Sequence, residues 1–352
     1  MDDQTFLGDY GKNFWHKPAK RDSDIQTVLP IKKIRKTYPQ NWKIYDYVKS
    51  NEKIFFMKVL KALIDSLKLP YDYKGNGRLP ITIEDRLKSC ILKVYQKSDA
   101  RKLVSDLILF KSLGFLNYAP SFRSINYFME DSRLTLYLNQ LIKLTAEPLA
   151  PIESCVAIDS TGFSTFNRVD WIDIRFSKYY NKLRKDYKKL HIVTGTKSNI
   201  ILSAKITKGT VHDSPEFEDL IKQSVYFDIK QVAGDPAYLS RKNCEIVASI
   251  KAVPFILPKK NSTTRAKGSP AWSHMVKFFR DNETEFRKHY HTRSNVESSF
   301  AMLKRNYLPY VRAKSDIGQE NEGLCKVICH NIAVLIMSVF EYNLNTKYLE
   351  TN

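Results

Sequence analysis

Two aspartates in this chain each end an apolar run, and a glutamate lies in a stretch with helical character. Asp159 ends CVAID, Asp235 ends VAGD, and Glu297 lies within SNVESSFAMLKRNY. An apolar run that stops at a carboxylate is typical of a buried strand that delivers this group to a sheet edge. Mg²⁺ prefers carboxylate oxygens, and a pair of such ions can drive an in-line phosphoryl displacement. Because the chain is strongly basic, these residues predict a Mg²⁺ site that cuts nucleic acid.

The glutamate also belongs to a motif of four residue types at fixed spacing. The motif is Tyr290-x2-Arg293-x3-Glu297-x6-Lys304. A carboxylate flanked by two cations suits the phosphates on either side of a scissile bond, and the tyrosine could stack or donate a hydrogen bond. Two structural alternatives stay open. Arg293 and Glu297 could form a solvated ion pair, and Ser294 with Glu297 could form a capping box that uses the carboxylate on a backbone N–H.

These motifs and their surroundings resemble the DDE transposases of prokaryotic insertion sequences, in the group with the YREK signature. The segment VHDSPEFEDL is similar to the family's His-Asp signature, GDPAYLS to its second-aspartate block, and RSNVESSFAMLKR to its glutamate block. The resemblance implies an α/β fold, a ribonuclease-H-like mixed sheet flanked by helices, in which the first and fourth strands are neighbours. It also implies two Mg²⁺ ions, replaceable by Mn²⁺, with Asp159 bridging both while Asp235 and Glu297 hold one each.

The activity that this resemblance implies is transposition. The enzyme would bind the terminal inverted repeats of its element as a homodimer on double-stranded DNA, hydrolyse a phosphodiester to free a 3′-OH, and direct that hydroxyl onto target DNA. Two rivals stay open: a metal-dependent nuclease of the same fold without strand transfer, and a non-catalytic DNA-binding descendant of a transposase. In the His-Asp signature, Asp213 is predicted to cap the helix that opens at Ser214, and His212 receives no catalytic role.

Charge and composition agree with a DNA-binding protein of two domains. The chain has 352 residues and a formal charge of +20, which residues 1–150 and 151–352 share equally. Both parts therefore suit a phosphate backbone, although a general lysine bias of the proteome is an alternative. The five scattered cysteines form no CxxC pair, and the acidic N-terminus does not read as a signal peptide. These features predict a cytoplasmic, nucleoid-associated protein.

The most apolar stretch is GLCKVICHNIAVLIMSVFEY, near the C-terminus. Lys326, His330 and Asn331 interrupt it, so we expect a core helix and no membrane span. Cys325 and Cys329, one helical turn apart on this stretch, are expected to be core residues.

Three regions are predicted along the chain. Residues 1–43 read as a basic arm, residues 44–147 as a helical, helix-turn-helix-like DNA-binding domain, and residues 152–342 as the ribonuclease-H-like catalytic domain. Arg123 lies near the start of the predicted second helix of the helix-turn-helix, where such motifs read DNA. A plain helical bundle that supports the catalytic domain is the alternative. Thr82, Ser98 and Ser121 are the predicted helix caps.

Two basic segments are predicted to follow the DNA backbone. Residues 175–190, RFSKYYNKLRKDYKKL, interleave basic residues with tyrosines, and we assign Lys188 and Lys189 to DNA contacts. A second basic patch lies in the loop KKNSTTRAKGSP. A solvated charged loop is the alternative for the first segment.

Overall fold

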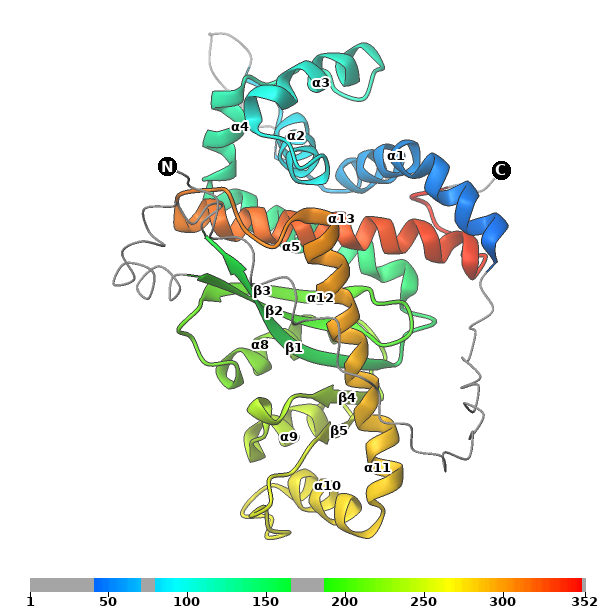
Figure 1. The fold of residues 1–352 in the computed structure, drawn as a ribbon, viewed down its shortest axis with the longest axis vertical. Helices are drawn as coiled ribbons and strands as arrows, with labels where there is room; N and C mark the ends of the chain where they lie inside the picture. The colour runs from blue at the N-terminus through cyan, green and yellow to red at the C-terminus, as the bar shows by residue number, and fades with distance from the viewer. Residues whose placement is uncertain (1–40, 71–79, 166–186, 350–352) are drawn as a thin grey trace, which may run out of the picture. The chain divides into compact units, whose positions relative to one another are not determined.

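The computed structural model describes residues 41–70, 80–165 and 187–349 of the protein (Figure 1). Residues Asn41–Asn352 form one compact unit. Residues 1–40 of the predicted basic arm and residues 175–186 of the basic-aromatic segment lie outside the described residues. The domain boundaries predicted from the sequence stay predictions.

A five-stranded mixed sheet forms the centre of the fold. Its strands are β1 (Cys155–Ser164), β2 (Tyr187–Gly195), β3 (Ile201–Lys208), β4 (Gln231–Gly234) and β5 (Val253–Ile256). The strand order is β3-β2-β1-β4-β5. The first three strands form an antiparallel meander, whereas β4 and β5 run parallel to β1. This ribonuclease-H-like arrangement confirms the predicted fold class, including the contact between the first and fourth strands.

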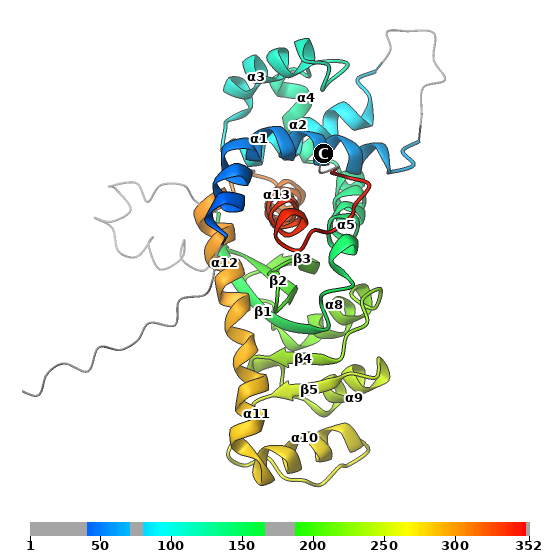
Figure 2. The same ribbon diagram turned by 90° about the vertical axis from the view of Figure 1, so that its right-hand side faces the viewer.

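Helices cover both faces of the sheet. They are α8 (Phe217–Gln223), α9 (Arg241–Ser249), α10 (Pro270–Asp281), α11 (Glu283–Tyr290) and α12 (Ser294–Tyr307). Figure 2 shows α8 and α9 on one side of the strands and α11 and α12 on the other. Helix α8 packs on β2 and β3, and α12 packs on β1. The long helical path of α11 and α12 therefore crosses the strand that carries Asp159.

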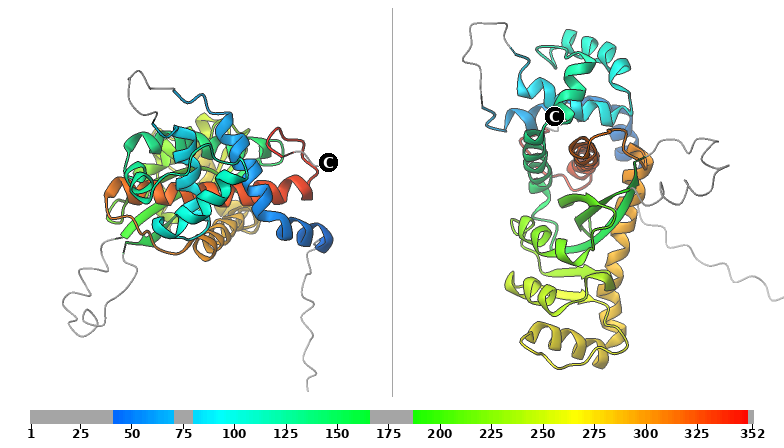
Figure 3. Two further views of the ribbon diagram at one scale, coloured as in Figure 1. Left: turned by 90° about the horizontal axis from the view of Figure 1, so that it is seen from above. Right: turned by 90° about the vertical axis from the view of Figure 1, so that its left-hand side faces the viewer.

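A group of helices precedes the sheet. They are α1 (Trp42–Asp65), α2 (Ile83–Tyr95), α3 (Ala100–Ser112), α4 (Phe122–Met129) and α5 (Ser132–Ala146). The last helix of the chain, α13 (Asp316–Glu341), packs against α1, α2, α5 and β3 (Figure 3). The first and last parts of the described chain therefore share one hydrophobic core.

Helix α13 is a buried core helix, as predicted. By length and composition alone it could cross a membrane, contrary to the sequence expectation, but 78% of its most apolar window is buried within the structure. Its polar side chains bond to the protein backbone: Lys326 Nζ donates to the Leu308 carbonyl (2.9 Å), and His330 Nε2 to that of Asn199 (2.9 Å). Cys325 and Cys329 are both buried and unbridged. These contacts explain how a largely apolar helix accommodates polar groups inside the protein.

The buried Asn331 side chain hydrogen-bonds α13 to the edge strand β3. Asn331 accepts from the Ile201 N–H (2.9 Å) and donates to the Ile201 carbonyl (2.8 Å). It also donates to Thr145 Oγ1 of α5. Buried backbone groups need partners, and here an amide supplies them on the side of β3 that pairs with no other strand among the described residues.

Two of the three helix caps predicted for the helices before the sheet are present in the structure. Thr82 caps α2 and Ser121 caps α4, each through a backbone N–H three residues on, as expected. The prediction for α3 is wrong: Asp99, and not Ser98, is its cap. The Asp99 carboxylate accepts from the N–H groups of Arg101 and Lys102, and a charged acceptor that satisfies two such donors is preferred over the neighbouring hydroxyl.

The loop between α3 and α4 is held by two buried charged residues of α2. The Asp85 carboxylate accepts from the N–H groups of Asn117 (3.3 Å) and Tyr118 (2.8 Å). The Lys88 ammonium donates to the Phe115 carbonyl. This loop, residues 113–121, is longer than the roughly four-residue turn of a helix-turn-helix. The helix-turn-helix-like interpretation stays a prediction.

Candidate active site

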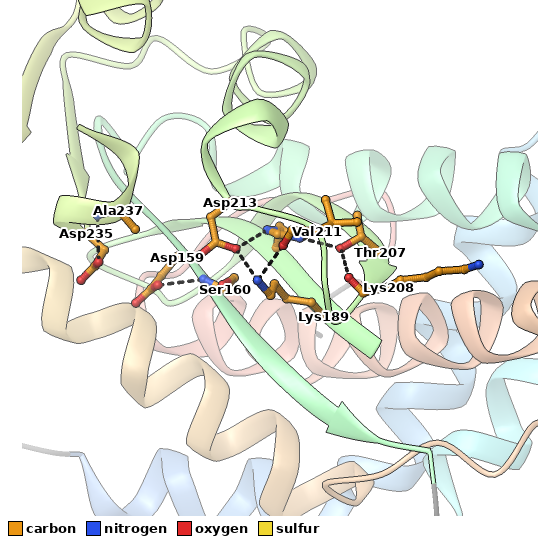
Figure 4. A network of polar contacts seen from close by, with 10 residues as sticks. Asp159, Ser160, Lys189, Thr207, Lys208, Val211, Asp213, Asp235 and Ala237 are labelled. Atoms are coloured by element: carbon orange, nitrogen blue, oxygen red, sulfur yellow. Dashed lines mark hydrogen bonds and ion pairs between the residues drawn. The ribbon is translucent and has the colours of Figure 1, made fainter. Parts of the chain in front are cut away.

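The pairing of β1 with β4 brings Asp159 and Asp235 to the same level of the sheet. The parallel register matches Ile158 with Gly234, so each aspartate is the next residue beyond that pair. Residues in register on neighbouring parallel strands point to the same face. Figure 4 shows the two carboxylates next to each other, close to the helix that crosses the sheet. Asp159 Oδ1 accepts from the Ser160 N–H (2.8 Å), and Asp235 Oδ2 from the Ala237 N–H (3.1 Å).

The four motif residues follow one nearly continuous helical path. Tyr290 ends α11, Arg293 ends the 3₁₀ turn His291–Arg293, and Glu297 and Lys304 lie on α12. The capping-box alternative does not form, because the Ser294 hydroxyl donates to the His291 carbonyl and α12 has no side-chain cap. The Glu297 carboxylate is therefore not engaged at the helix terminus.

The Arg293 guanidinium joins the three acidic residues. Its Nη1 lies 2.8 Å from Asp159 Oδ2 and 3.9 Å from Asp235 Oδ1. Its Nη2 lies 2.9 Å from Glu297 Oε1. Three carboxylates thus converge on one cation; they come from β1, from the residue after β4, and from α12. The predicted Arg293–Glu297 pair is only part of this arrangement.

This site is short of positive charge. Three ionised carboxylates share a single guanidinium, which leaves a formal charge of −2 on the group. Burial raises the pKa of Asp159 to about 6, against the lowering effects of the Ser160 N–H and of Arg293. The Asp159 and Arg293 side chains are 18% and 20% exposed. A divalent cation would supply the missing charge, and carboxylate oxygens are the ligands that Mg²⁺ prefers.

The three carboxylates are therefore chemically suitable ligands for divalent ions, but their present positions do not form a binding site for one. Among the residues that the structure describes, no three acidic, histidine or cysteine side chains lie close enough to hold one ion as they stand. The guanidinium of Arg293 occupies the space between the carboxylates. Metal binding would require this side chain to move.

A fourth carboxylate, Asp213, lies near Asp159 and Asp235 (Figure 4). It does not cap the following helix, so that prediction is wrong. Instead Asp213 Oδ1 pairs with Lys189 Nζ (3.0 Å) and lies 3.5 Å from His191 Nδ1. An ammonium in a partly buried site is a stronger partner than a backbone N–H. Burial lowers the pKa of His191, so the ring is neutral and Lys189 supplies the counter-charge. His212 is exposed.

The residues assigned to DNA contacts differ in their exposure and in whether they already form ion pairs within the protein. Lys188 is buried and its ammonium pairs with Asp316 at the start of α13, and Lys189 is paired as described above. Both already have partners inside the protein, which weakens their case as DNA contacts. Lys304 is half-buried, burial lowers its pKa, and it forms no ion pair within the described residues. Arg123 is exposed at the start of α4, near the ring of Phe122.

The predicted second basic patch lies on the loop after β5, which leaves the same edge of the sheet as the loop that carries Asp235. Its basic side chains are all exposed: Lys259, Lys260, Arg265 and Lys267. The side chains of Arg280, Trp272 and Ser273 donate to backbone carbonyls of the same loop. These hydrogen bonds hold its backbone and leave the charges facing outward.

Sequence reasoning found the three carboxylates and missed the role of Arg293 as their common partner. The signal in the sequence is an arginine four residues before a glutamate, which predicts only a surface i,i+4 pair. The contacts of Asp213 with Lys189 and His191 could not be predicted from the sequence. They depend on the packing of the loop after β3 against β2, which no local pattern reveals.

Comparison with known protein families agrees with this geometry. The model of the transposase DDE domain matches residues 150–332, just over half of the chain. The match spans β1 to most of α13 and contains all three carboxylates. With the ribonuclease-H-like sheet and the convergent acidic residues, it shows that this chain belongs to the DDE transposase family.

Proposed function

We propose that this transposase binds the ends of a mobile DNA element, cleaves phosphodiester bonds there with Mg²⁺, and joins the freed 3′-OH ends to target DNA. We assign it to the YREK-signature group and propose that it acts as a homodimer on paired ends in the cytoplasm, on nucleoid DNA. The observation that carries this proposal is the convergence of Asp159, Asp235 and Glu297 on one guanidinium.

These three carboxylates are the residues that would hold the metal ions, and Mn²⁺ is expected to replace Mg²⁺. When bound, divalent ions polarise the phosphate and activate the attacking oxygen. In the first reaction the water oxygen attacks phosphorus and the bond to the 3′-oxygen breaks, which leaves a 3′-OH. In the second, that hydroxyl attacks a target phosphate and displaces another 3′-oxygen. The sheet register fixes the backbone positions of Asp159 and Asp235, and α12 fixes that of Glu297.

Phosphate contacts position the DNA and carry most of its affinity. We propose Tyr290, Arg293 and Lys304 as contacts near the scissile phosphate and Arg123 as a contact from the helical region. Lys304 is supported by its place on α12, two turns beyond Glu297, with its charge free of ion pairs to described residues. The exposed basic loop after β5 would extend the same surface.

Asp159→Asn tests this proposal on a plasmid that carries the DNA flanking the gene. We expect wild-type protein with Mg²⁺ to cut at the element ends and to form joined products. The variant should lose cleavage while its affinity for end DNA stays within a few-fold, because phosphate contacts are retained. Asp228→Asn, at an exposed aspartate paired with Lys230, is the matched control and should keep full activity.

The products separate the possible results. Cutting by Asp159→Asn at the wild-type rate would remove this residue from the active site. Cutting by the wild type at the ends without any joined product would indicate a nuclease. Binding of end DNA without cutting in Mg²⁺ or Mn²⁺ would indicate a non-catalytic descendant.

A further inference from the structure

The position of Arg293 raises the question of how three acidic residues accept metal ions at all. Its guanidinium lies within hydrogen-bonding distance of Asp159 and Glu297 and within 4 Å of Asp235. One cation therefore already lies where all three carboxylates meet.

The geometry suits a temporary cation. Guanidinium groups pair with carboxylates through a planar set of donors, and here the two Nη atoms serve different acids. The centre of the Tyr290 ring lies 5.9 Å from the guanidinium carbon, so the arginine also contacts an aromatic ring. The Arg293 side chain is partly exposed, so it can turn outward without unfolding the helices that carry it.

We propose that Arg293 is an exchangeable counter-ion: it holds the three carboxylates together in the metal-free protein and leaves them when divalent cations bind. This inference rests on the metal site of the proposed function and adds a competition to it. Arg293 and a divalent ion cannot both occupy the centre of the group, because like charges at such short range repel strongly when partly buried.

The competition has a consequence for metal affinity. The Arg293 guanidinium partly neutralises the three carboxylates. A metal ion that binds there must first displace this guanidinium. Removal of this positive charge should therefore strengthen metal binding, although the residue lies inside the active site. A residue that served only to bind DNA phosphate would leave the metal affinity of DNA-free protein unchanged.

Titration of the DNA-free, full-length protein with Mn²⁺ by calorimetry tests the proposal. We expect Arg293→Gln to bind Mn²⁺ at least about tenfold more tightly than the wild type, because one unit charge within about 4 Å of the ligands is removed. Arg287→Gln is the matched control. Arg287 lies on α11 and pairs with Glu283 of the same helix, so its loss should leave Mn²⁺ affinity unchanged. Asp159→Asn should bind Mn²⁺ far more weakly.

Each result has one meaning. Equal or weaker Mn²⁺ binding by Arg293→Gln, with binding lost in Asp159→Asn, would overturn the counter-ion role and leave the metal site intact. Unchanged Mn²⁺ binding by Asp159→Asn would overturn the metal site itself.

Thermal unfolding gives a second readout that does not depend on tight binding. In EDTA, Arg293→Gln should unfold at a lower temperature than the wild type, because the carboxylates lose their shared partner. Saturating Mn²⁺ should remove most of this difference, since the ions replace the missing charge. A deficit that persists in Mn²⁺ would mean that Arg293 acts as a fixed structural residue and would overturn the proposal.

Discussion

Asp159→Asn should make the metal-free protein more stable at neutral and alkaline pH, although it removes one of the three carboxylates of the proposed metal site. Burial raises the pKa of Asp159 from its ordinary 3.8 to about 6. The folded protein therefore favours the protonated, neutral form of this carboxyl group more than the unfolded chain does. The favourable contribution is fully present below pH 3.8, falls as the pH rises through 6, and is absent above it.

The magnitude follows from the difference between the two pKa values. One pKa unit corresponds to 1.36 kcal/mol, so a rise of about two units corresponds to about 3 kcal/mol of lost stability once Asp159 is ionised. The side chain is 18% exposed, so solvent screening reduces this value little. Asparagine is neutral at every pH and avoids the cost. We expect a gain of up to about 3 kcal/mol at pH 8, and roughly 5 °C in the unfolding temperature.

The assay is thermal or urea unfolding in EDTA, for wild type and variant, between pH 4 and pH 8. The gain should be large at pH 8 and small at pH 4, because folded-state Asp159 is protonated there and the unfolded-state group is close to its ordinary pKa of 3.8. Asp228→Asn, at a side chain 81% exposed, should change stability by less than about 0.5 kcal/mol. A variant that is less stable than the wild type at pH 8, or a gain that does not depend on pH, would refute the reasoning.

Two further predictions concern buried charge and DNA contact. Asp85→Ala should cost about 2–4 kcal/mol of unfolding free energy in urea, because two N–H groups of the loop after α3 lose their hydrogen bonds to a buried, charged acceptor. Asp99→Ala, which removes an exposed cap, should cost only about 1 kcal/mol, and equal costs would contradict this account. Lys304→Ala should weaken binding to end DNA and reduce its log–log salt slope by about one. The control Lys230→Ala should not change that slope, and an unchanged slope for Lys304→Ala would remove it from the phosphate contacts.

Much of the catalytic region could be predicted from local sequence. The strands and helices from β1 to β5 appear in the expected order, because alternating and continuous apolar runs reflect burial on a sheet and turn residues mark their ends. The caps Thr82 and Ser121 were also local, since each acts on an N–H three residues away. Asp159 and Asp235 stood out because each ends an apolar run. Only Asp235 follows the end of its strand: β1 continues past Asp159 to Ser164, because its pairing with β2 extends as far as Tyr187.

The pairings between distant residues were decided by the tertiary structure. Asp213 was expected to cap its own helix, and instead β2 places Lys189 beside it. Arg293 was expected to face phosphate or Glu297 alone, and the packing of the turn His291–Arg293 on β1 and β4 places it among three carboxylates. Local patterns report what each residue prefers, whereas a charged group finally pairs with the strongest partner that the fold brings within reach. The sequence by itself determined which residues are the candidates for the chemistry, and the fold decided which of them form ion pairs with one another.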